Sequence, residues 1–374
     1  MAIVKFGDIV RDVKINVDRA NNPYEHYVAG DHMDSEDLTI HRYGSFETDD
    51  VGPAFTRIFK PGQILYGSRR TYLKKVAVAD FEGICANTTF VLESKDEALF
   101  DNRLLPFIML SDAFTRWSIA HSKGSTNPYV LFSDLADYEF DLPPLAEQKV
   151  LADKLWAAYR LKESYKKLLV ATEEMVKSQF IEMFGGGNWP QKTLSEVGSF
   201  TRGGGFLKSD FVEHGIPCIH YGQIHTKFGP FITSHITEIS SDLESKTKFA
   251  SKGDLVIAIT SEDTEGSCKS TAWLGDYPVA VGGHAAIYKH SMNPLYMSFF
   301  FKSTLFNYAK IEYVHGTKVF EIKPDDIAKI LVPCPPMSLQ NQFSAIAEQS
   351  DKSGFELRKS IEAIDQVIKS LINS

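Results

Sequence analysis

The stretch Pro143-Pro144-Leu145-Ala146-Glu147-Gln148 begins the longest part of the chain that lacks both proline and glycine. A similar stretch occurs a second time. Its counterpart is Pro335-Pro336-Met337-Ser338-Leu339-Gln340, which lies 192 residues further along. A proline pair at the start of a helix is common, because the missing N–H would have no partner there. The motif alone therefore does not establish a duplication.

The repeat extends backwards from the proline pairs at the same spacing. Gly124-Ser125 is matched by Gly316-Thr317, and Asp134-Leu135-Ala136 by Asp326-Ile327-Ala328, without an insertion or deletion. Several matched elements at one spacing favour a duplicated unit of domain plus helix. A duplicated unit is typical of a protein that engages two similar targets at a set distance.

Each proline pair is followed by the pattern of a long amphipathic helix. About 40 residues at 1.5 Å each make a rod of roughly 60 Å, which needs a partner to cover its apolar stripe. The first stripe is mostly apolar and comprises Leu151, Leu155, Ala158, Lys162, Tyr165, Leu169, Thr172, Val176 and Gln179. At the same register the second comprises Phe343, Ala347, Ser350, Gly354, Leu357, Ile361, Ile364, Ile368 and Leu371. We expect the two helices to pair as an antiparallel coiled coil, with a bend or frayed turn at Gly354.

The segments between the helices predict two α+β domains with mixed, mostly antiparallel sheets. Short β-like runs such as 64–66, 76–78, 255–259 and 279–281 alternate with glycine-rich and polar turns. One shorter helix is expected in each domain, at Asp101–His121 and Asn293–Val314. The predicted division is 1–142 for the first domain, 143–187 for the central helix, 188–334 for the second domain and 335–374 for the distal helix.

Length and composition fit two globular domains. The chain has 374 residues, of which 43% are hydrophobic and 24% charged, and a net charge of −8. The four cysteines lie far apart without a C-x-x-C pair, so neither a disulfide framework nor a zinc ribbon is supported. No signal peptide and no run of about 20 apolar residues is present, which predicts a cytoplasmic protein without a membrane partner.

Motifs of catalysis are absent or incomplete. Asn21-Asn22-Pro23-Tyr24 and Asn127-Pro128-Tyr129 lack the paired prolines of an adenine methyltransferase motif, and no phosphate-binding loop exists. Gly203-Gly204-Gly205 does not follow G-x-G-x-x-G and is interpreted as a flexible turn close to a ligand backbone. His220, His225, His284 and His315 lack helical zinc spacing. We therefore predict no catalytic residue, no metal site and no cofactor in this chain.

A basic stretch in the first domain predicts a surface for nucleic acid. Residues 51–79 carry no acidic residue, and tyrosines are interleaved with the cations. The alternative is a solvated pair of strands balanced by distant acids. Arg69-Arg70 is the favoured pair, because guanidinium groups bind guanine edges and phosphates with two hydrogen bonds. The predicted DNA-binding residues of this domain are Arg57, Lys60, Arg69, Arg70, Tyr72, Lys74, Lys75, Lys123 and Thr126.

The second domain has a more polar set of candidates. Glutamine and histidine can read base edges, while threonine and lysine favour phosphates. Glu262 and Asp263 could accept a hydrogen bond from cytosine or could simply cap a turn. The predicted DNA-binding residues are Arg202, Tyr221, Gln223, His225, Ser261, Lys269, Thr317 and Lys318.

The arrangement resembles the specificity subunits of type I restriction-modification systems. The resemblance rests on the stretches 142–149 and 335–343, which are similar to the Pro-Pro-Leu-x-Glu-Gln opening of the family's conserved helix, and on the segments that lead into them. It implies two target recognition domains that each read one half of a split DNA sequence, with the helices setting the spacer. It also implies two methyltransferase subunits that carry S-adenosylmethionine and methylate adenine, and restriction subunits that can join to cleave DNA. Because the two domains differ strongly in sequence, the target is expected to be asymmetric.

The resemblance further implies that the long helices dock the methyltransferases. Candidate docking residues outside the paired stripe are Trp156, Leu161, Met175 and Phe180, although some of them could instead broaden the core between the helices. Two other classes of function stay open from the residues alone. The chain could be an autonomous nuclease or methyltransferase with an unrecognised site, or a bivalent scaffold that binds proteins.

Overall fold

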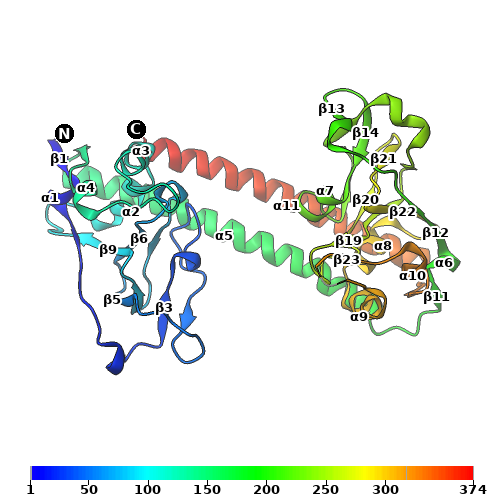
Figure 1. The fold of residues 1–374 in the computed structure, drawn as a ribbon, viewed down its shortest axis with the longest axis horizontal. Coiled ribbons are helices and arrows are strands. Elements are labelled where there is room, and N and C mark those ends of the chain that lie inside the picture. Colours follow the sequence, from blue (N-terminus) through cyan, green and yellow to red (C-terminus); the bar gives the residue numbers. More distant parts are fainter. Residues whose placement is uncertain (1, 317, 374) are drawn as a thin grey trace. The chain divides into compact units, whose positions relative to one another are not determined.

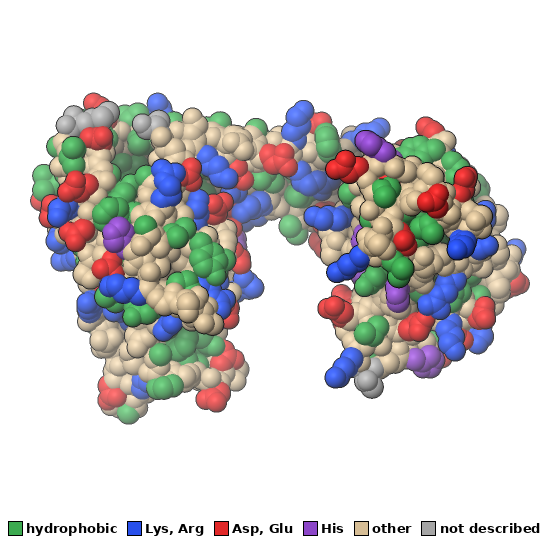
Figure 2. Space-filling model, turned by 45° about the horizontal axis from the view of Figure 1, so that its top comes forward, with side chains coloured by type: hydrophobic (Ala, Val, Ile, Leu, Met, Phe, Trp, Pro, Cys, Tyr) green, Lys and Arg blue, Asp and Glu red, His purple; other side chains and the backbone are tan. Residues whose placement is uncertain are grey.

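The computed structural model of the chain describes residues 2–316 and 318–373, and it is drawn in Figure 1. Contacts divide the chain into two compact units. Unit 1 comprises Met1–Lys166 with Lys359–Ser374, and unit 2 comprises Lys167–Arg358. Each unit thus contains one domain together with the halves of the long helices that pack on it. Basic and acidic side chains are interspersed on the face shown in Figure 2.

Two four-stranded sheets form the body of unit 1. One sheet is antiparallel with the order β2-β9-β6-β7, and the other has the order β4-β3-β8-β5 with β3 parallel to β8. A separate antiparallel pair joins β1 to β10, the strand that comes just before the first long helix. The strands are β1 (Ala2–Lys5), β2 (Val10–Asp12), β3 (His26–Val28), β4 (Gly44–Ser45), β5 (Phe55–Phe59), β6 (Ile64–Gly67), β7 (Val76–Val78), β8 (Gly83–Ala86), β9 (Thr89–Ser94) and β10 (Glu139–Leu142). The helices before the long one are α1 (Phe6–Ile9), α2 (Leu105–Leu110), α3 (Asp112–Ala120) and α4 (Phe132–Ala136).

Unit 2 repeats this plan with more strands. Its main sheets have the orders β12-β22-β18-β20-β15 and β13-β16-β14-β21-β17, and smaller pairs join β11 to β24 and β19 to β23. The strands are β11 (Gln191–Thr193), β12 (Gly198–Arg202), β13 (Phe211–Val212), β14 (Ile216–Ile219), β15 (Phe231–Ile232), β16 (Thr237–Ile239), β17 (Phe249–Ala250), β18 (Leu255–Ala258), β19 (Thr260–Ser261), β20 (Ser270–Trp273), β21 (Val279–Val281), β22 (Ala285–His290), β23 (Phe320–Glu321) and β24 (Leu331–Pro333). The short helices are α6 (Leu194–Val197), α7 (Tyr221–Thr226), α8 (Pro294–Phe300), α9 (Thr304–Lys310) and α10 (Pro324–Ile327). The predicted α+β class with mixed, mostly antiparallel sheets is confirmed.

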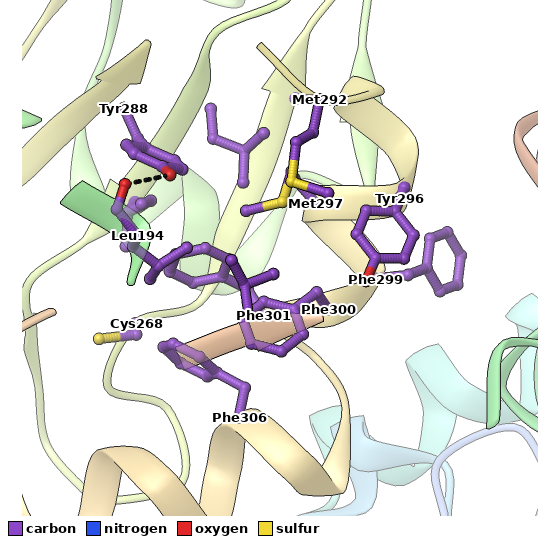
Figure 3. Close-up of a cluster of buried hydrophobic side chains, with 14 of the residues drawn as sticks. Leu194, Cys268, Tyr288, Met292, Tyr296, Met297, Phe299, Phe300, Phe301 and Phe306 are labelled. Atoms are coloured by element: carbon purple, nitrogen blue, oxygen red, sulfur yellow. Dashed lines mark hydrogen bonds between the residues drawn. The ribbon is translucent and has the colours of Figure 1, made fainter. Parts of the chain in front are cut away.

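The core of unit 2 is rich in aromatic side chains (Figure 3). Phe301 and Phe306 are buried with ring centroids 4.3 Å apart. Tyr288 is also buried, and its hydroxyl donates a hydrogen bond of 2.8 Å to the carbonyl of Leu194. Burying a side chain of this size contributes roughly 1.5–3 kcal/mol, provided that its polar atoms are paired. The pairing of the tyrosine hydroxyl therefore preserves the gain from burial.

The glutamine of the repeated motif is a buried structural residue. In unit 1 the side-chain oxygen of Gln148 accepts a hydrogen bond from the backbone N–H of Asp101 at 2.9 Å. Its amide nitrogen donates to the carbonyls of Pro143 at 2.8 Å and Leu99 at 3.0 Å. Gln148 thus joins the start of the long helix to the segment that enters the short helices.

Unit 2 has the same contact. The side-chain oxygen of Gln340 accepts from the backbone N–H of Asn293 at 2.9 Å, and its nitrogen donates to the carbonyl of Pro335 at 2.8 Å. Asn293 and its counterpart Asp101 are themselves N-caps. Because the same atoms meet at the same spacing of 192 residues, the duplication extends to three dimensions.

The single short helix expected in each domain is in fact two helices. The breaks fall at Ser111, between α2 and α3, and at Ser303, between α8 and α9. Each serine has an extended backbone and caps the second helix, because its hydroxyl accepts from the backbone N–H of Phe114 or Phe306. The prediction missed both breaks because serine within a helical pattern is a weak signal for a cap.

The long helices are α5 (Leu145–Phe184) and α11 (Met337–Ile372), and a half of each belongs to each unit. Within unit 1, Lys162 of α5 lies 2.6 Å from Asp365 of α11. Within unit 2, the rings of Phe180 and Phe184 of α5 lie 5.2 and 5.7 Å from that of Phe343 of α11. The early half of α5 thus meets the late half of α11, and the late half of α5 meets the early half of α11. The predicted antiparallel pairing is confirmed.

Gly354 does not interrupt the second helix. Helix α11 continues through it, and a Cβ atom at this position would lie 3.4 Å from Cδ1 of Leu169 in α5. The expectation of a frayed turn at Gly354 was therefore wrong. The glycine gives the two helices room for close approach, and packing outweighs its low helix propensity.

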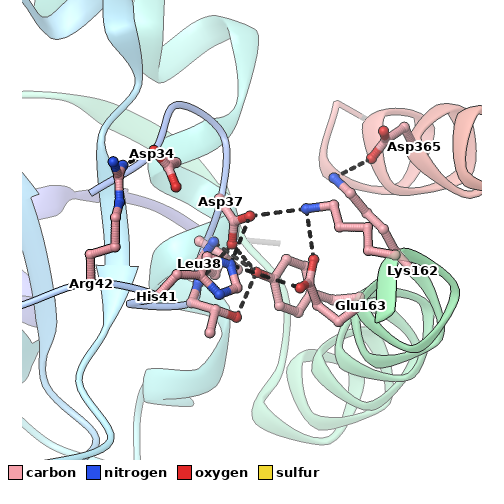
Figure 4. A network of polar contacts seen from close by, with 11 residues as sticks. Asp34, Asp37, Leu38, His41, Arg42, Lys162, Glu163 and Asp365 are labelled. Atoms are coloured by element: carbon pink, nitrogen blue, oxygen red, sulfur yellow. Dashed lines mark hydrogen bonds and ion pairs between the residues drawn. The ribbon is translucent and has the colours of Figure 1, made fainter. Parts of the chain in front are cut away.

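A polar network ties the loop around Asp37 to helix α5 in unit 1 (Figure 4). The carboxylate of Asp37 accepts from the hydroxyl of Tyr159 at 2.6 Å and from Nζ of Lys166 at 2.9 Å. Burial alone would raise the pKa of Asp37, but these hydrogen bonds outweigh it and hold the pKa at about 2. Asp37, His41 and Glu163 are potential metal ligands within 4.8 Å of one another. However, Lys166 also lies 2.8 Å from Glu163 and already supplies the positive charge.

Candidate nucleic-acid interface

A tight turn and a loop come together on the surface of unit 1. Lys123 and Tyr129 exchange two backbone hydrogen bonds of 2.7 and 2.9 Å, which close a turn that begins at Gly124 with a φ of +89°. The loop that follows β6 pairs with this turn, because Arg69 bridges to Tyr129 and the backbone N–H of Arg70 donates to Pro128 at 2.7 Å. The backbone therefore holds the two segments in a fixed relation.

The side chains of this junction are exposed and mostly cationic. The guanidinium of Arg69 lies 5.9 Å from the centre of the Tyr129 ring, and Tyr72 is 53% exposed. Among the described residues, neither Arg69 nor Arg70 forms an ion pair, whereas Lys123 lies 2.9 Å from Asp134. Unpaired guanidinium groups beside an aromatic ring suit contact with phosphates and base edges. The structure thus brings together five predicted residues, which are Arg69, Arg70, Tyr72, Lys123 and Thr126.

Arg57 does not fit its predicted role. Its side chain is buried, with 8% of the residue exposed, and it pairs with Asp12 at 2.9 Å and with the carbonyl of Thr89 at 3.0 Å. Burial raises the pKa of Asp12, and Arg57 opposes that shift. The arginine thus neutralises a buried acid instead of facing DNA.

The other basic residues of the stretch have acidic or backbone partners. Nζ of Lys74 lies 3.0 Å from Glu36 and 3.5 Å from Asp112, so its charge is largely balanced. Lys75 donates to the carbonyl of Gly30 at 2.5 Å. Lys60 is exposed, 3.8 Å from Glu82. For Lys74 and Lys75 the alternative of a balanced strand pair describes the structure better than a DNA contact does.

In unit 2 the ends of the equivalent segment, 192 residues further on, are paired in the same way, with different side chains. His315 and Glu321 exchange backbone hydrogen bonds of 3.0 and 2.8 Å, as Lys123 and Tyr129 do. Glu321 pairs with Thr260 in the strand pair β19–β23, and its carboxylate lies 3.2 Å from the guanidinium of Arg202. An acid thus stands where unit 1 has an aromatic ring.

Predicted residues of unit 2 gather around this turn. Nε2 of His225 lies 2.9 Å from the carbonyl of Thr260, and Nζ of Lys269 donates to the carbonyl of His225 at 3.3 Å. The ring of Tyr221 lies 5.1 Å from that of His284. Arg202, Tyr221, His225 and Lys269 therefore belong to one surface.

Two predicted residues of unit 2 are buried. Gln223 lies inside helix α7, where its oxygen accepts from the backbone of His220 at 3.1 Å and its nitrogen donates to Thr237 at 3.0 Å. Ser261 is buried in β19 and accepts from the backbone N–H of Asp263. Both side chains stabilise turns and do not face solvent, so their predicted roles are corrected. Lys318 is exposed next to the turn, and Thr317 lies outside the described residues.

Tyr129 and Glu321 were missed as members of the interface. The spacing of 192 residues relates Lys123 to His315 and Tyr129 to Glu321, so it identifies the second member of each pair once the first is placed at the junction. For Asp263, the structure favours the capping of a turn over a contact with cytosine, because its carboxylate accepts from the backbone N–H of Gly266 at 2.5 Å.

The four candidate docking residues fall into two groups. Trp156 packs on Phe107 with ring centroids 5.2 Å apart, and its N–H donates to the carbonyl of Arg103 at 2.9 Å. Phe180 is buried in the core of unit 2. Trp156 therefore packs α5 against unit 1 and Phe180 packs it against unit 2, so their predicted role in docking a partner is corrected. Leu161 and Met175 are 45% and 52% exposed and remain candidates.

No helix among the described residues has the length and apolar character that a membrane span requires. Cys85, Cys218 and Cys268 are buried free thiols, and Cys334 is half-buried.

Comparisons with known proteins point to one family. Residues 24–171 match the family model described as a type I restriction modification DNA specificity domain. The specificity subunit of the type I restriction enzyme EcoDI of Escherichia coli is 30% identical over 148 residues, covering 40% of this chain and 32% of that subunit. The aligned region thus spans about a third of that relative. The specificity subunit of the enzyme MjaVIII of Methanocaldococcus jannaschii is 22% identical over 315 residues, covering 78% of this chain and 73% of that one.

Solved structures show the same fold over the whole chain. The type I restriction-modification S subunit from M. genitalium matches with a TM-score of 0.58 at 13% identity, covering 99% of this chain and 94% of that one. A chain from a structure that concerns complex assembly and conformational transition of the type I R-M system matches with a TM-score of 0.59 at 18% identity, covering 99% and 96%. These comparisons confirm the resemblance found in the sequence: residues 24–171 are similar to the DNA specificity domain of type I restriction-modification systems, and the fold of the chain is that of solved type I specificity subunits.

Proposed function

We propose that this chain is the DNA-recognition subunit of a type I restriction-modification enzyme and has no catalytic site of its own. One observation carries the proposal: both units build the same junction of turn and strand-following loop, at 123–129 and 315–321, from different side chains. A shared backbone frame with divergent side chains suits two domains that read different sequences in the same way.

The two junctions offer different chemistry to DNA. Unit 1 presents the guanidinium groups of Arg69 and Arg70, which suit guanine edges and phosphates. Unit 2 presents His225 and Lys269 beside a guanidinium that is already paired with Glu321. The two halves of the target are therefore proposed to differ in sequence, which gives an asymmetric, bipartite site.

The chemistry is proposed to lie on partner subunits. Exposed apolar residues of α5, among them Leu161, Leu168 and Met175, suit the docking of two methyltransferase subunits that carry S-adenosylmethionine. Those subunits would methylate adenine, and restriction subunits could join to cleave DNA. The paired helices would set the length of the unread spacer, and the complex would act in the cytoplasm.

The test is selection of duplexes from a randomised pool by this chain co-purified with its methyltransferase. A bipartite motif with an unread gap is expected. Arg69→Ala should relax only one half of that motif, and Lys269→Ala only the other. Enrichment of one continuous motif would contradict the proposal.

Two further measurements separate the alternatives. The chain alone, incubated with DNA and Mg²⁺ or with labelled S-adenosylmethionine, should show no turnover, and any turnover would favour an autonomous enzyme. DNA affinity should fall steeply with salt, since phosphate contacts release counterions. A flat salt dependence would favour a scaffold that binds proteins.

A further inference from the structure

Unit 2 contains a cleft of about 820 Å³ that is lined in part by four glycines, which together are called the glycine floor. Gly203 and Gly205 line it from one segment, and Gly282 and Gly283 from another. The segments touch, since Gly204 bridges to Gly282, and a Cβ at Gly203 would lie 2.3 Å from the Gly282 carbonyl oxygen. Glycine is required where the two segments approach this closely, and a ligand can reach the backbone at this floor.

Unit 1 carries side chains at the corresponding positions. Phe6 donates its backbone N–H to the carbonyl of Tyr138, just before β10, and Leu194 donates its own to the carbonyl of Ile330, just before β24. Counting onward from these two equivalent residues, Gly203, Gly204 and Gly205 correspond to Ile15, Asn16 and Val17. The glycine floor is therefore a property of unit 2 and does not belong to the shared frame.

The walls of the cleft are aromatic. Phe211 and His220 lie with ring centroids 5.5 Å apart at 80°, and Tyr221 and His284 with centroids 5.1 Å apart. Phe206 lines the same cleft. Burial lowers the pKa of His220, so its imidazole is neutral near pH 7 and offers a flat uncharged face. Such walls suit a planar aromatic group that stacks.

Cations stand at the rim. The guanidinium of Arg202 donates to the carbonyl of Gly283 at 3.0 Å and is held by Glu321 at 3.2 Å. Lys208 is exposed at the same cleft. A nucleotide combines a flat aromatic base with a negatively charged phosphate, so aromatic residues beside cations suit a nucleotide. Through Glu321 the rim is continuous with the turn proposed above to contact DNA.

We propose that this cleft receives one unstacked nucleotide of the DNA half-site read by unit 2, with its base between the aromatic walls and its phosphate at Arg202 and Lys208. The inference rests on the proposed function, because it needs that surface to bind DNA. A stacked base in a duplex cannot offer both faces to protein, whereas an extruded base can. Stacking on aromatic side chains is tolerant of sequence, so the cleft would stabilise a deformation of the DNA.

The experiment uses duplexes of the selected site with 2-aminopurine at successive positions, bound to the complete complex. Gly205→Leu is the decisive variant, because Gly205 lines the cleft and a Cβ there meets no atom within 4 Å, so the larger side chain can occupy space that the base would need. Gly52→Leu is the matched control, since Gly52 has equally open surroundings in unit 1.

We expect a several-fold rise in fluorescence at one position of the half-site of unit 2. The rise should persist with Gly52→Leu and disappear with Gly205→Leu. A methyltransferase also extrudes its target base, so the informative position is one that is not methylated. A mismatch at that position should tighten binding about tenfold for the wild type, because a mismatched base is easier to extrude, and should have no effect with Gly205→Leu.

His284→Ala provides a second variant that leaves the glycine floor intact, and it should weaken the fluorescence signal. If a bipartite site is selected but no unmethylated position responds, the inference fails while the proposed function stands. If no bipartite site is selected, the proposed function itself fails. Micromolar binding of a free deoxynucleoside monophosphate without DNA would also overturn the inference, because the cleft would then be a site for free nucleotides.

Discussion

The repeated glutamine offers a direct test of how the two domains are attached to the long helices. In Gln340→Leu the side chain keeps its size but loses both hydrogen bonds, which leaves the N–H of Asn293 and the carbonyl of Pro335 without this partner. Only 3% of Gln340 is exposed, so water cannot readily replace it. An unsatisfied buried group costs about 1–3 kcal/mol, and burial of the leucine returns part of the sum. We expect unit 2 to lose about 3 kcal/mol of stability.

Urea unfolding followed by hydrogen exchange of peptides from each unit measures this loss. With a slope of about 2–3 kcal/mol per molar urea, the midpoint of unit 2 should fall by about 1 M. Gln342→Leu is the matched control, because Gln342 is exposed on the same turn of α11, and it should shift the midpoint by less than about 0.3 M. Gln148→Leu should act in the same way on unit 1. Equal shifts from Gln340→Leu and Gln342→Leu would refute the structural role of the motif.

Further outcomes concern charge. Because the folded pKa of Asp37 is about 2 and the unfolded value is near 3.8, this carboxylate stabilises unit 1 above pH 4. This carboxylate should contribute about 2 kcal/mol to the stability that is lost as the pH falls from 4 to 2, and urea titrations should show a loss smaller by about that amount in Asp37→Asn. Asp365→Ala leaves the buried ammonium of Lys162 unpaired and should lower stability by about 2 kcal/mol, and thermal unfolding should show recovery when Lys162→Met is added. Arg69→Ala should weaken DNA binding about tenfold in a salt titration, whereas Arg11→Ala, which removes a side chain paired with an acid elsewhere in unit 1, should leave it nearly unchanged.

The architecture could be predicted because it rests on local patterns. The proline pairs, the absence of glycine and proline after the first pair, and the apolar stripes fix two long helices whatever surrounds them. Their pairing follows, since each stripe needs an apolar partner. Lys162 looked like a flaw in the first stripe, but Asp365 on the opposite helix provides its counter-charge.

The site was harder to predict, because exposure depends on contacts that are distant in sequence. Arg57 looks like its neighbours, yet its partner Asp12 precedes it by 45 residues. Phe180 lies outside the stripe that was expected to face α11, so the sequence predicted that it would be exposed. It is buried because α5 also packs against the aromatic core of unit 2. Gln223 is turned inward by the short helix α7, which the alternating polar residues had concealed. Of the sequence signals used, only the spacing of the repeat relates residues that lie so far apart in the chain.

The nature of the repeated contact explains why so little of the two domains is alike. Gln148 and Gln340 bind main-chain atoms, namely an N–H at the entry to the short helices and the carbonyl of the first proline. Main-chain atoms are the same for almost every residue, so the contact constrains the glutamine and the path of the chain but few other side chains. The junction turns obey the same logic, since they are closed by backbone hydrogen bonds whether the residues are Lys123 and Tyr129 or His315 and Glu321. A frame held by backbone contacts leaves the outward side chains free to change. Under the proposed function, the bases read by one unit could therefore change without altering its attachment to the helices.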